Sequence, residues 1–320
     1  MHSPPRILFP SLSAKIGLYE KVLAQARQFN PDSKVIGTDS DPECFAAKLV
    51  EEFRLMPLID HLPDTQLKKY LEELGITHVL PTRDQELGYW SERAKLLQQC
   101  GVKVWISRSN FIKACSDKFQ FYKTWKHSAI SPIETKLSIE DENSGQWVVK
   151  EKYGTGACNI GLDLSVSEAE KCAYLLKNPI FQPFIRGKEF TAETWVSKQG
   201  RCHGIVLRWR NHVVEGESHE TTVFTHPKWE QAMQDVFLHV KGAHGHILAQ
   251  VLVDKEEQLH LVEINPRLGG ASPLSLSAGL SSIAWHLMEE NDNCSQIPLS
   301  PPIRNGMKLI KERSIQWISA

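Results

Sequence analysis

Short apolar runs alternate with longer segments of helical spacing along the first hundred residues of the chain. Residues 6–10 and 34–38 are apolar runs typical of buried strands, and residues 14–29 between them carry an apolar helical face. The same pattern predicts helices at 45–52, 65–74 and 85–99 and strands at 78–81 and 102–106. Strands joined by helices indicate a parallel sheet covered on both faces. Residues 1–107 are therefore expected to form a Rossmann-like α/β domain.

From residue 108 onward the pattern changes, because strands dominate and several are joined by short turns. Helices are expected at 118–127, with Ser116 or Asp117 as the N-cap, at 165–177 and 227–240 and from Ser275 to Leu287. Strands are expected at 146–150, 162–164, 181–185, 203–210, 246–253, 259–264 and 307–318. Residues 211–226 show no clear periodicity and are expected to be disordered. This part of the chain is therefore expected to be α+β.

The first strand-to-helix turn, around residues 10–17, lacks the G-x-G-x-x-G spacing of dinucleotide-binding proteins, so NAD binding is not expected. Ligands of open α/β sheets bind at the carboxyl ends of the strands. Polar residues at these ends are candidate substrate contacts, although each could equally be an ordinary cap or turn residue. They are Ser11, Ser13, Asp39, Arg83, Asp84 and Glu86.

The richest candidate chemistry lies in residues 258–275, QLHLVEINPRLGGASPLS. Glu263 and Asn265 are two positions apart on an expected strand, so they project from the same face. A carboxylate beside an amide oxygen is a ligand set that Mg²⁺ prefers. Arg267 adds a planar fork that suits a phosphate. The alternative interpretation is an edge strand that ends in an ordinary polar turn.

A second strand supports the metal-site interpretation. Residues 246–253, HILAQVLV, and the turn at 254–257 make this strand antiparallel to the strand of Glu263. Gln250 is therefore expected nearly opposite Glu263. A lone glutamine in an apolar run is costly to bury without partners, and a place beside the metal explains it.

A glycine-rich loop follows the expected strand at 146–150, with Gly154, Gly156 and Gly161. Its backbone N–H groups could fold over phosphates. Lys150 stands at the end of the strand, where it can place its charge on the α- or β-phosphate. A mobile hairpin without a ligand is the alternative interpretation.

Composition narrows the class of protein. The 320 residues carry 37 Lys+Arg against 38 Asp+Glu, and this balance gives no indication of a nucleic-acid or membrane-surface partner. Seven cysteines, none in C-x-x-C spacing, favour free thiols in a reducing cytoplasm, and no apolar run is long enough to span a membrane. Four histidines without metal-ligand spacing are expected to be scattered surface residues: His239, His244, His246 and His260.

The order of these motifs resembles the ATP-grasp superfamily, and within it most closely the members similar to the large subunit of carbamoyl-phosphate synthase. The likeness rests on a Gln strand followed by E-I-N-P-R-x-G-G and P-L-S, matched by Gln250, Glu263, Asn265, Arg267, Gly269, Gly270 and Pro273 to Ser275. The resemblance covers essentially the whole chain. It implies a Rossmann-like pre-ATP-grasp domain at 1–107 and a two-lobed ATP-grasp domain at 108–320, with a lid at about 127–183. It also implies ATP and Mg²⁺, with Mn²⁺ as a possible substitute and Gln250, Glu263 and Asn265 as metal ligands.

The resemblance further implies a nucleotide site. In the family a basic residue at the position of Lys118 reaches the phosphates, and a linker strand, here 181–185, pairs its backbone with adenine. Pro183 replaces the usual Glu and has no N–H, so its neighbours would have to contact the base. Glu189 sits where the family places a carboxylate on the ribose. The implied ATP contacts are Lys118, Lys150, Gly154, Gly156, Gln182, Phe184, Ile185 and Glu189.

Three arginines are the catalytic candidates. Arg208 and Arg210 share a face of their strand, and similar relatives carry R-x-R before a G-E-S-like segment near the transferred phosphate. The chain has no G-x-S-x-G motif and no cysteine in a setting that marks it as reactive, so the attacking group is expected to come from the substrate. Arg208 and Arg210 would hold the substrate carboxylate and the oxyanion, and Arg267 would neutralise phosphate charge.

The expected function is therefore an ATP-dependent carboxylate–amine ligase that forms an amide through an acyl phosphate and releases ADP and phosphate. Its partners would be a small-molecule carboxylate and an amine, and relatives often form dimers. Two alternatives stay open. One is the carboxyphosphate and carbamate chemistry of the synthase, although this chain has one ATP-grasp unit and no visible glutaminase. The other is a non-catalytic ATP-binding module, in which loss of the metal residues would be expected.

Overall fold

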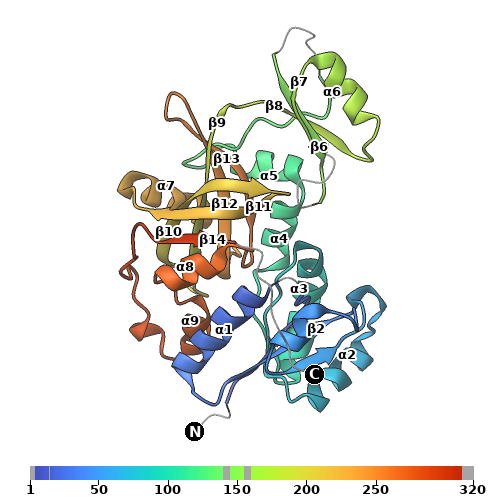
Figure 1. Ribbon diagram of the computed structural model, residues 1–320, viewed down its shortest axis with the longest axis vertical. Helices are drawn as coiled ribbons and strands as arrows, with labels where there is room; N and C mark the ends of the chain where they lie inside the picture. The colour runs from blue at the N-terminus through green and yellow to red at the C-terminus, as the bar shows by residue number, and fades with distance from the viewer. Residues whose placement is uncertain (1–3, 14, 140–144, 155–159, 312–320) are drawn as a thin grey trace.

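The computed structural model describes residues 4–13, 15–139, 145–154 and 160–311. Gly156, with Ala157 and Cys158 of the same glycine-rich loop, lies outside the described residues, as does the last part of the strand expected at 307–318. Three β-sheets and the helices packed on them build the described chain (Figure 1). No helix in this part of the chain is long and apolar enough to cross a membrane.

The first sheet is the expected parallel one, with strand order β3-β2-β1-β4-β5. Its strands are β1 (Arg6–Phe9), β2 (Lys34–Asp39), β3 (Phe53–Leu55), β4 (His78–Val79) and β5 (Lys103–Val104), connected by α1 (Ile16–Phe29), α2 (Asp64–Glu73), α3 (Asp84–Gln99) and the 3₁₀ turns η1 (Phe45–Leu49) and η2 (Ile59–His61). The predicted helix at 45–52 is wrong beyond Leu49, and β3 went unpredicted. This strand has three residues on a sheet edge with mostly exposed side chains, so it leaves no period-two pattern.

The second sheet has six antiparallel strands in the order β13-β12-β9-β10-β11-β14. They are β9 (Gly187–Val196), β10 (Cys202–Val214), β11 (Glu217–Phe224), β12 (Gly245–Asp254), β13 (Leu259–Asn265) and β14 (Lys308–Ile310). The expectation of disorder at 211–226 is wrong, because β10 and β11 pair along this segment. Their turn residues Glu215 and Gly216 both have positive φ, as in the two-residue turns that suit hairpin twist. Polar side chains on both faces of this hairpin hid the alternation.

The third sheet is a small separate lobe with the order β7-β6-β8 (Figure 1). Its strands are β6 (Trp147–Glu151), β7 (Gly161–Leu164) and β8 (Pro179–Pro183), and α6 (Val166–Ala173) packs on them. Ser165 begins α6 with a capping box, in which Ser165 and Glu168 satisfy each other's backbone N–H groups. Trp147, Val149, Ala169 and Phe181 form the core of the lobe.

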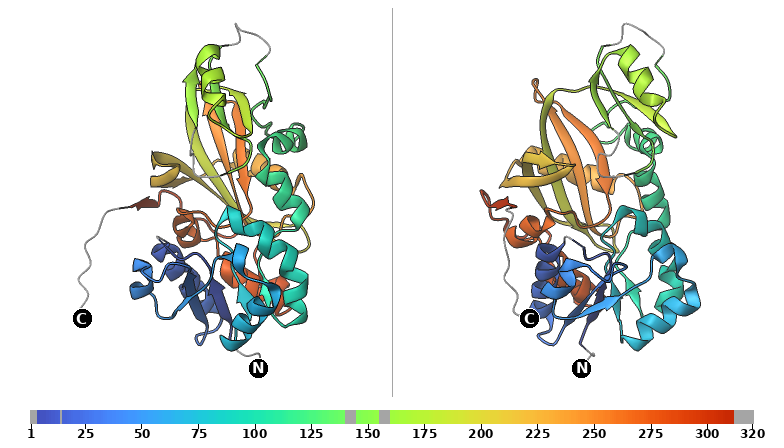
Figure 2. Two further views of the ribbon diagram at one scale, coloured as in Figure 1. Left: turned by 90° about the vertical axis from the view of Figure 1, so that its right-hand side faces the viewer. Right: turned by 45° about the vertical axis from the view of Figure 1, so that its right-hand side comes forward.

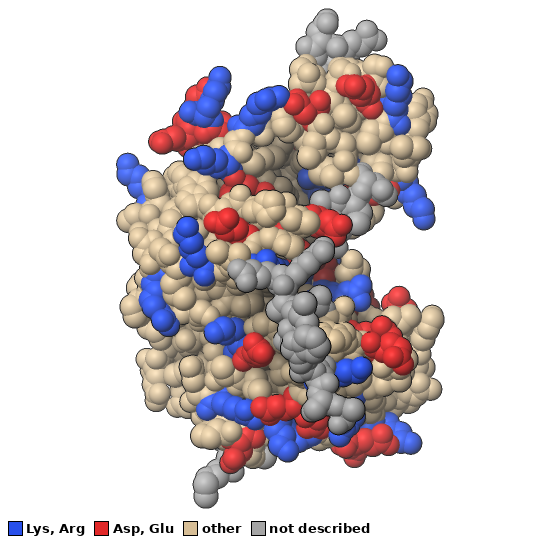
Figure 3. Space-filling view, viewed as in Figure 1, with Lys and Arg blue, Asp and Glu red and all other residues tan. Residues whose placement is uncertain are grey.

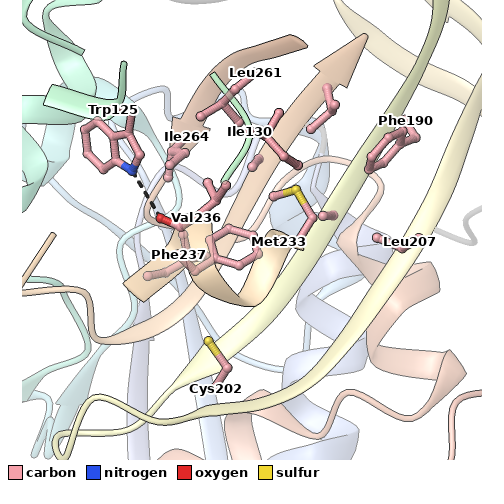
Figure 4. Packing of buried hydrophobic residues seen from close by; sticks show 14 of the residues in the cluster. Trp125, Ile130, Phe190, Cys202, Leu207, Met233, Val236, Phe237, Leu261 and Ile264 are labelled. Atoms are coloured by element: carbon pink, nitrogen blue, oxygen red, sulfur yellow. Dashed lines mark hydrogen bonds between the residues drawn. The ribbon is translucent and has the colours of Figure 1, made fainter. Parts of the chain in front are cut away.

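The segment between the first sheet and this lobe is helical. α4 (Ser109–Ser116) and α5 (Lys118–Trp125) meet at Asp117, whose carboxylate accepts from the N–H groups of Phe119 and Gln120 and so caps α5 as expected. Trp125 ends α5 inside the main core, and its indole donates to the carbonyl of Val236 at 3.1 Å (Figure 4). This contact attaches α5 to α7 (Pro227–Leu238), which covers the second sheet.

After β13 the chain returns to the first domain, as the two further views show (Figure 2). The single helix expected after Ser275 is two helices, α8 (Ser272–Ala278) and α9 (Ser282–Glu290), separated by Gly279 with φ of 133°. Leu276, Ile283 and Leu287 join the core that α1 forms with β1 and β2. A short 3₁₀ turn, η3 (Cys294–Gln296), follows. Because Leu274, Ala278 and Trp285 of the same two helices pack in a separate core with β9, β10 and β11, α8 and α9 link the first sheet to the second.

Candidate active site

Four side chains form one row across the second sheet. In the strand registers Glu263 of β13 is opposite Gln250 of β12, Gln250 is opposite Thr191 of β9, and Thr191 is opposite Arg208 of β10. The predicted pairing of Gln250 with Glu263 is confirmed. All four residues line the same cavity. Thr191 is fully buried and its hydroxyl has no hydrogen-bond partner within the described chain, so the row contains a polar atom that a ligand or water can satisfy.

Glu263 and Asn265 lie side by side, as their shared strand face predicts. The amide nitrogen of Asn265 donates to Glu263 Oε1 at 2.7 Å. This hydrogen bond orients the amide so that its oxygen points away from the carboxylate. One carboxylate oxygen and one amide oxygen thereby remain for a ligand, and both residues are half-buried at the cavity. This all-oxygen set, with Gln250 beside it, fits a hard cation such as Mg²⁺.

Arg267 joins the two domains at this cavity. Its Nε donates to Asp84 Oδ1 at 2.7 Å and its Nη2 donates to Asp84 Oδ2, so the carboxylate is held in a fork. Asp84 is the first residue of α3 in the first domain, whereas Arg267 follows β13. The sequence gives no signal of this ion pair, because its two residues are far apart along the chain. The Asp84 carboxylate neutralises part of the Arg267 charge that was expected to act on phosphate.

Lys118 and Lys150 approach the site from α5 and β6. Lys118 Nζ donates to the carbonyl of Gly154 at 2.8 Å, so the helix start and the glycine-rich loop are in contact. Burial lowers the pKa of Lys118, opposed mainly by Glu263. Burial also lowers the pKa of Lys150 to about 8, with Glu263 opposing and Lys118 adding to the shift. Both ammonium groups therefore lie within the electrostatic reach of the Glu263 carboxylate.

The expected adenine segment is β8 and the residues after it. Its strand bounds end at Pro183, so Phe184 and Ile185 lie beyond the strand. Phe184 N–H donates to the carbonyl of Gln146 at 2.8 Å, and the buried side-chain amide of Gln182 donates to the Thr135 hydroxyl at 2.8 Å. With Pro183 lacking an N–H, the remaining expected donor in this segment is the amide of Ile185.

The arginines of β10 have acidic partners on β9: Arg210 pairs with Glu189, the expected ribose contact, and Arg208 pairs with Glu193, which the sequence did not single out. Arg210 Nε lies 3.1 Å from Glu189, whose pKa is raised by burial against the opposing effect of Arg210. Arg208 Nε and Nη2 donate to Glu193 Oε1 at 2.8 and 2.6 Å. Glu189 and Glu193 share a face at period-two positions of β9, which is the signal that could have identified Glu193.

Glu193 is fully buried and has a second partner. His246 Nε2 lies 3.0 Å from its other oxygen, and His246 Nδ1 bonds to Ser282 at 2.8 Å. Burial raises the pKa of Glu193, but Arg208 and His246 outweigh it and bring the value to about 2. His246 is therefore a buried member of this hydrogen-bonded network, and the prediction that it is a scattered surface histidine is wrong. His244 is likewise half-buried against Glu289.

A cavity of about 1340 Å³ is lined by the Glu263 row, Asn265, Arg210 and Arg267, whereas the expected ATP contacts Lys118, Lys150 and Glu189 and the β8 segment do not line it. It extends from the Glu263 row to the carboxyl edge of the first sheet, where Ser11, Asp39 and Asp84 line it as predicted. In the space-filling view a notch separates the lobe of β6 to β8 from the lower part of the molecule, and basic and acidic side chains are interspersed on this face (Figure 3). The cavity therefore brings together a candidate metal site, cationic side chains that suit phosphate binding and polar residues that suit a substrate.

Comparisons with known proteins agree with this architecture. The family model described as an ATP-grasp domain matches residues 115–271. No curated sequence is similar enough to match. The fold of the whole chain, a Rossmann-like sheet followed by two antiparallel sheets, is an ATP-grasp fold shared with solved ligases and carboxylases.

Among the similar solved structures is the biotin carboxylase domain of 2-oxoglutarate carboxylase from Hydrogenobacter thermophilus, crystallised with MgADP and bicarbonate. Its TM-score is 0.72 at 13% identity, over 95% of this chain and 73% of that one. N5-carboxyaminoimidazole synthetase from Staphylococcus aureus gives 0.67 at 14% identity, over 95% and 81%. L-amino acid ligase from Bacillus licheniformis gives 0.69 at 13% identity, over 96% and 79%. The particular likeness to carbamoyl-phosphate synthase stays a prediction.

Proposed function

We propose that this chain is an ATP-dependent carboxylate–amine ligase that releases ADP and phosphate. The observation that carries the proposal is the row from Glu263 through Gln250 and Thr191 to Arg208, which opens into a cavity shared with the first domain. A candidate metal-ligand set at one end and a guanidinium oriented by Glu193 at the other suit a phosphoryl transfer, which depends on positioning and charge neutralisation.

In the first step of the proposed reaction, a carboxylate oxygen of the substrate bonds to the γ-phosphorus of ATP. The bond from that phosphorus to the bridging oxygen breaks, and ADP leaves with the electron pair. In the second step a neutral amine, having lost its proton to water, attacks the acyl carbon. The carbon–oxygen bond to phosphate then breaks, phosphate leaves, and the nitrogen gives up a proton to form the amide.

The residues of this chain act by binding and orientation. Lys118 and Lys150 would contact the ATP phosphates, and Gln182, Ile185 and Glu189 the nucleoside, with Phe184 offering its carbonyl. Glu263, Asn265 and Gln250 would hold Mg²⁺, which when bound neutralises phosphate charge. Arg208, Arg210 and Arg267 would steady the substrate carboxylate and the developing oxyanion. Each arginine already has a carboxylate partner, so it is pre-oriented before substrate arrives.

A second candidate is phosphorylation of bicarbonate. The supporting observation is the similar Hydrogenobacter domain, which was crystallised with bicarbonate and MgADP. This candidate uses the same metal and phosphate residues and differs in the acceptor. A non-catalytic module has no supporting observation, because Glu263 and Asn265 are present and lie side by side at the cavity.

The experiment is a screen for ADP release with Mg·ATP against pooled amino acids and other carboxylates, with and without added bicarbonate. Mass spectrometry of the products should show a conjugate one water lighter than the sum of its parts. With an ¹⁸O-labelled carboxylate, one label should appear in the released phosphate. AMP and pyrophosphate, or unlabelled phosphate, would contradict the proposal, and ADP release that needs only bicarbonate would favour the second candidate.

A further inference from the structure

Two of the cations that line the cavity form no ion pair with a carboxylate of the described residues. Four of its basic residues are in ion pairs, namely Arg208 with Glu193, Arg210 with Glu189, Arg267 with Asp84 and Lys311 with Glu217. Lys15 and Arg83 also line the cavity, yet neither has a carboxylate oxygen within 4.0 Å among the described residues. Both belong to the carboxyl edge of the first sheet.

Lys15 is positioned by neutral oxygens. Its Nζ donates to the carbonyl of Ser11 at 3.0 Å and to the hydroxyl of Thr82 at 2.9 Å. The nearby Glu86 carboxylate is occupied, since it accepts from Ser11 Oγ and from the indole of Trp90 at 3.2 Å. An ammonium group has three N–H donors, so one remains for a ligand in the cavity.

The environment makes this charge costly. Burial lowers the pKa of Lys15 to about 8; Glu86 opposes the shift, Arg267 and Arg83 add to it, and Asp39 opposes it weakly. A half-buried ammonium whose anionic neighbours Glu86 and Asp39 are offset by the cations Arg267 and Arg83 is stabilised when a further anion binds beside it.

The loop that presents Lys15 is held in an unusual conformation. Ser11 and Ser13 have φ of 55° and 32°, in the left-handed region that non-glycine residues seldom adopt. The N–H of Ser13 donates to Asp39 at 2.9 Å, which fixes the loop to the end of β2. Such backbone strain is concentrated at ligand sites, where the surrounding contacts maintain it.

We propose that Lys15 and Arg83 bind an anionic group of the acceptor substrate, a carboxylate or a phosphate distinct from the reacting carboxylate. This inference rests on the proposed function and names its substrate class, an acceptor with a second anionic end. Arg267 interacts electrostatically with both ends of the proposed site. It lowers the pKa of Lys15, and Glu263 contributes to the raised pKa of Arg267 itself. The reacting carboxylate would be near Glu263 and the second anion near Lys15.

The first test measures Lys15 itself. Mg·ADP is added at saturation to occupy the nucleotide site, and the rate of Lys15 acetylation by acetic anhydride is followed by peptide mass spectrometry. A carboxylate arm contains succinate, glutarate and glutamate, a phosphate arm contains glycerol 3-phosphate and phosphoserine, and a neutral arm contains succinamide and glycerol. At least one anionic arm should slow acetylation threefold or more, and the arm that succeeds identifies the group. Equal rates in all three arms would overturn the inference.

Lys21 provides the matched control, because it lies on the same helix and is exposed. Its acetylation should be unaffected by every probe. With an acceptor found in the ADP-release screen, Lys15→Met should raise the KM for that acceptor about tenfold or more, while Lys15→Arg retains most affinity and Lys21→Met has no effect.

The two proposals fail in different ways. Ligation of an acceptor without a second anion, at a rate that Lys15→Met leaves unchanged, would overturn the Lys15 inference and leave the ligase intact. Protection of Lys15 by anions in a protein that forms AMP and pyrophosphate would retain the anion site and overturn the proposed reaction.

Discussion

Asp84 and Arg267 are 183 positions apart and form a two-pronged ion pair at the junction of the two domains. The pair is half-buried, so both its charge and its geometry matter to the cavity that it borders. The Asp84 carboxylate holds the guanidinium of Arg267 at the cavity that the Glu263 row also lines.

Asp84→Asn should therefore impair turnover more than folding. The substitution removes one charge and weakens the fork, so we expect the rate of ADP formation to fall at least tenfold while ATP affinity changes by less than threefold. Asp64→Asn is the control, because Asp64 is also the first residue of a helix and pairs with Arg93 at 2.7 Å on the surface. Equal losses in the two variants would contradict a special role for Asp84.

Glu263→Ala should abolish ADP formation and leave the melting temperature nearly unchanged. Glu263 is half-buried at the cavity edge, so its side chain contributes little to the core. Its carboxylate is the anionic member of the proposed metal site, and Mg²⁺ binds poorly without it. The measurements are ADP release and Mg²⁺-dependent protection of the nucleotide complex in thermal unfolding. Glu256→Gln, in the exposed turn before β13, should behave as wild type, and activity of Glu263→Ala at the wild-type rate would refute the metal site.

Lys150→Met should weaken ATP binding by about 1.5–3 kcal/mol, the range of hydrogen bonds to charged groups. Titration calorimetry gives the affinity directly. Lys171→Met removes an exposed lysine of α6 in the same lobe and should have no effect. An unchanged affinity in Lys150→Met would remove Lys150 from the nucleotide site.

ATP affinity should also depend on pH in the window set by Lys150. Its pKa is lowered from 10.5 to about 8, so the ammonium loses its proton as pH rises through 8 and phosphate binding weakens. Bound phosphate favours the charged form, so binding near pH 8 to 9 should take up protons. Calorimetry in buffers of different ionisation enthalpy measures this uptake, which should fall in Lys150→Met. Without ligand, the unfolded chain holds this proton more tightly, so the lysine's contribution to stability rises with pH between about 8 and 10.5.

Glu193→Gln should destabilise the fold by about 3–5 kcal/mol at neutral pH, because Arg208 would lose its buried counter-ion. The pKa of Glu193 is lowered from 4.5 to about 2, so its contribution is complete above 4.5 and is lost as pH falls toward 2. Denaturant unfolding between pH 2 and 7 should show a weaker acid dependence in the variant than in wild type. Glu220→Gln, on the half-buried face of β11, is the comparison, and a similar loss there would argue against the Arg208 network.

Local sequence determined much of the fold and of the site. The apolar runs at β1 and β2 and the helical spacing of α1 predicted the parallel sheet, because both periodicities are short-range properties of the chain. The pairing of Gln250 with Glu263 followed from a short turn, which leaves an antiparallel hairpin little freedom of register. The cap at Asp117 was equally local. The β10–β11 hairpin was missed because its polar side chains on both faces remove the alternation on which such a prediction depends.

Only the tertiary structure decided which side chains meet. The fold pairs side chains from elements whose separation along the chain carries no signal of contact. These pairs are Asp84 with Arg267, Glu193 with Arg208 and with His246, and Lys15 with Thr82. Sequence alone indicated free arginines for the substrate, whereas the fold gives each a carboxylate partner and leaves Lys15 and Arg83 without an ion pair to any residue that the structure describes. The physical reason is that residue type fixes a charge, while the balance of charges in a cavity depends on the packing that brings distant strands and helices together.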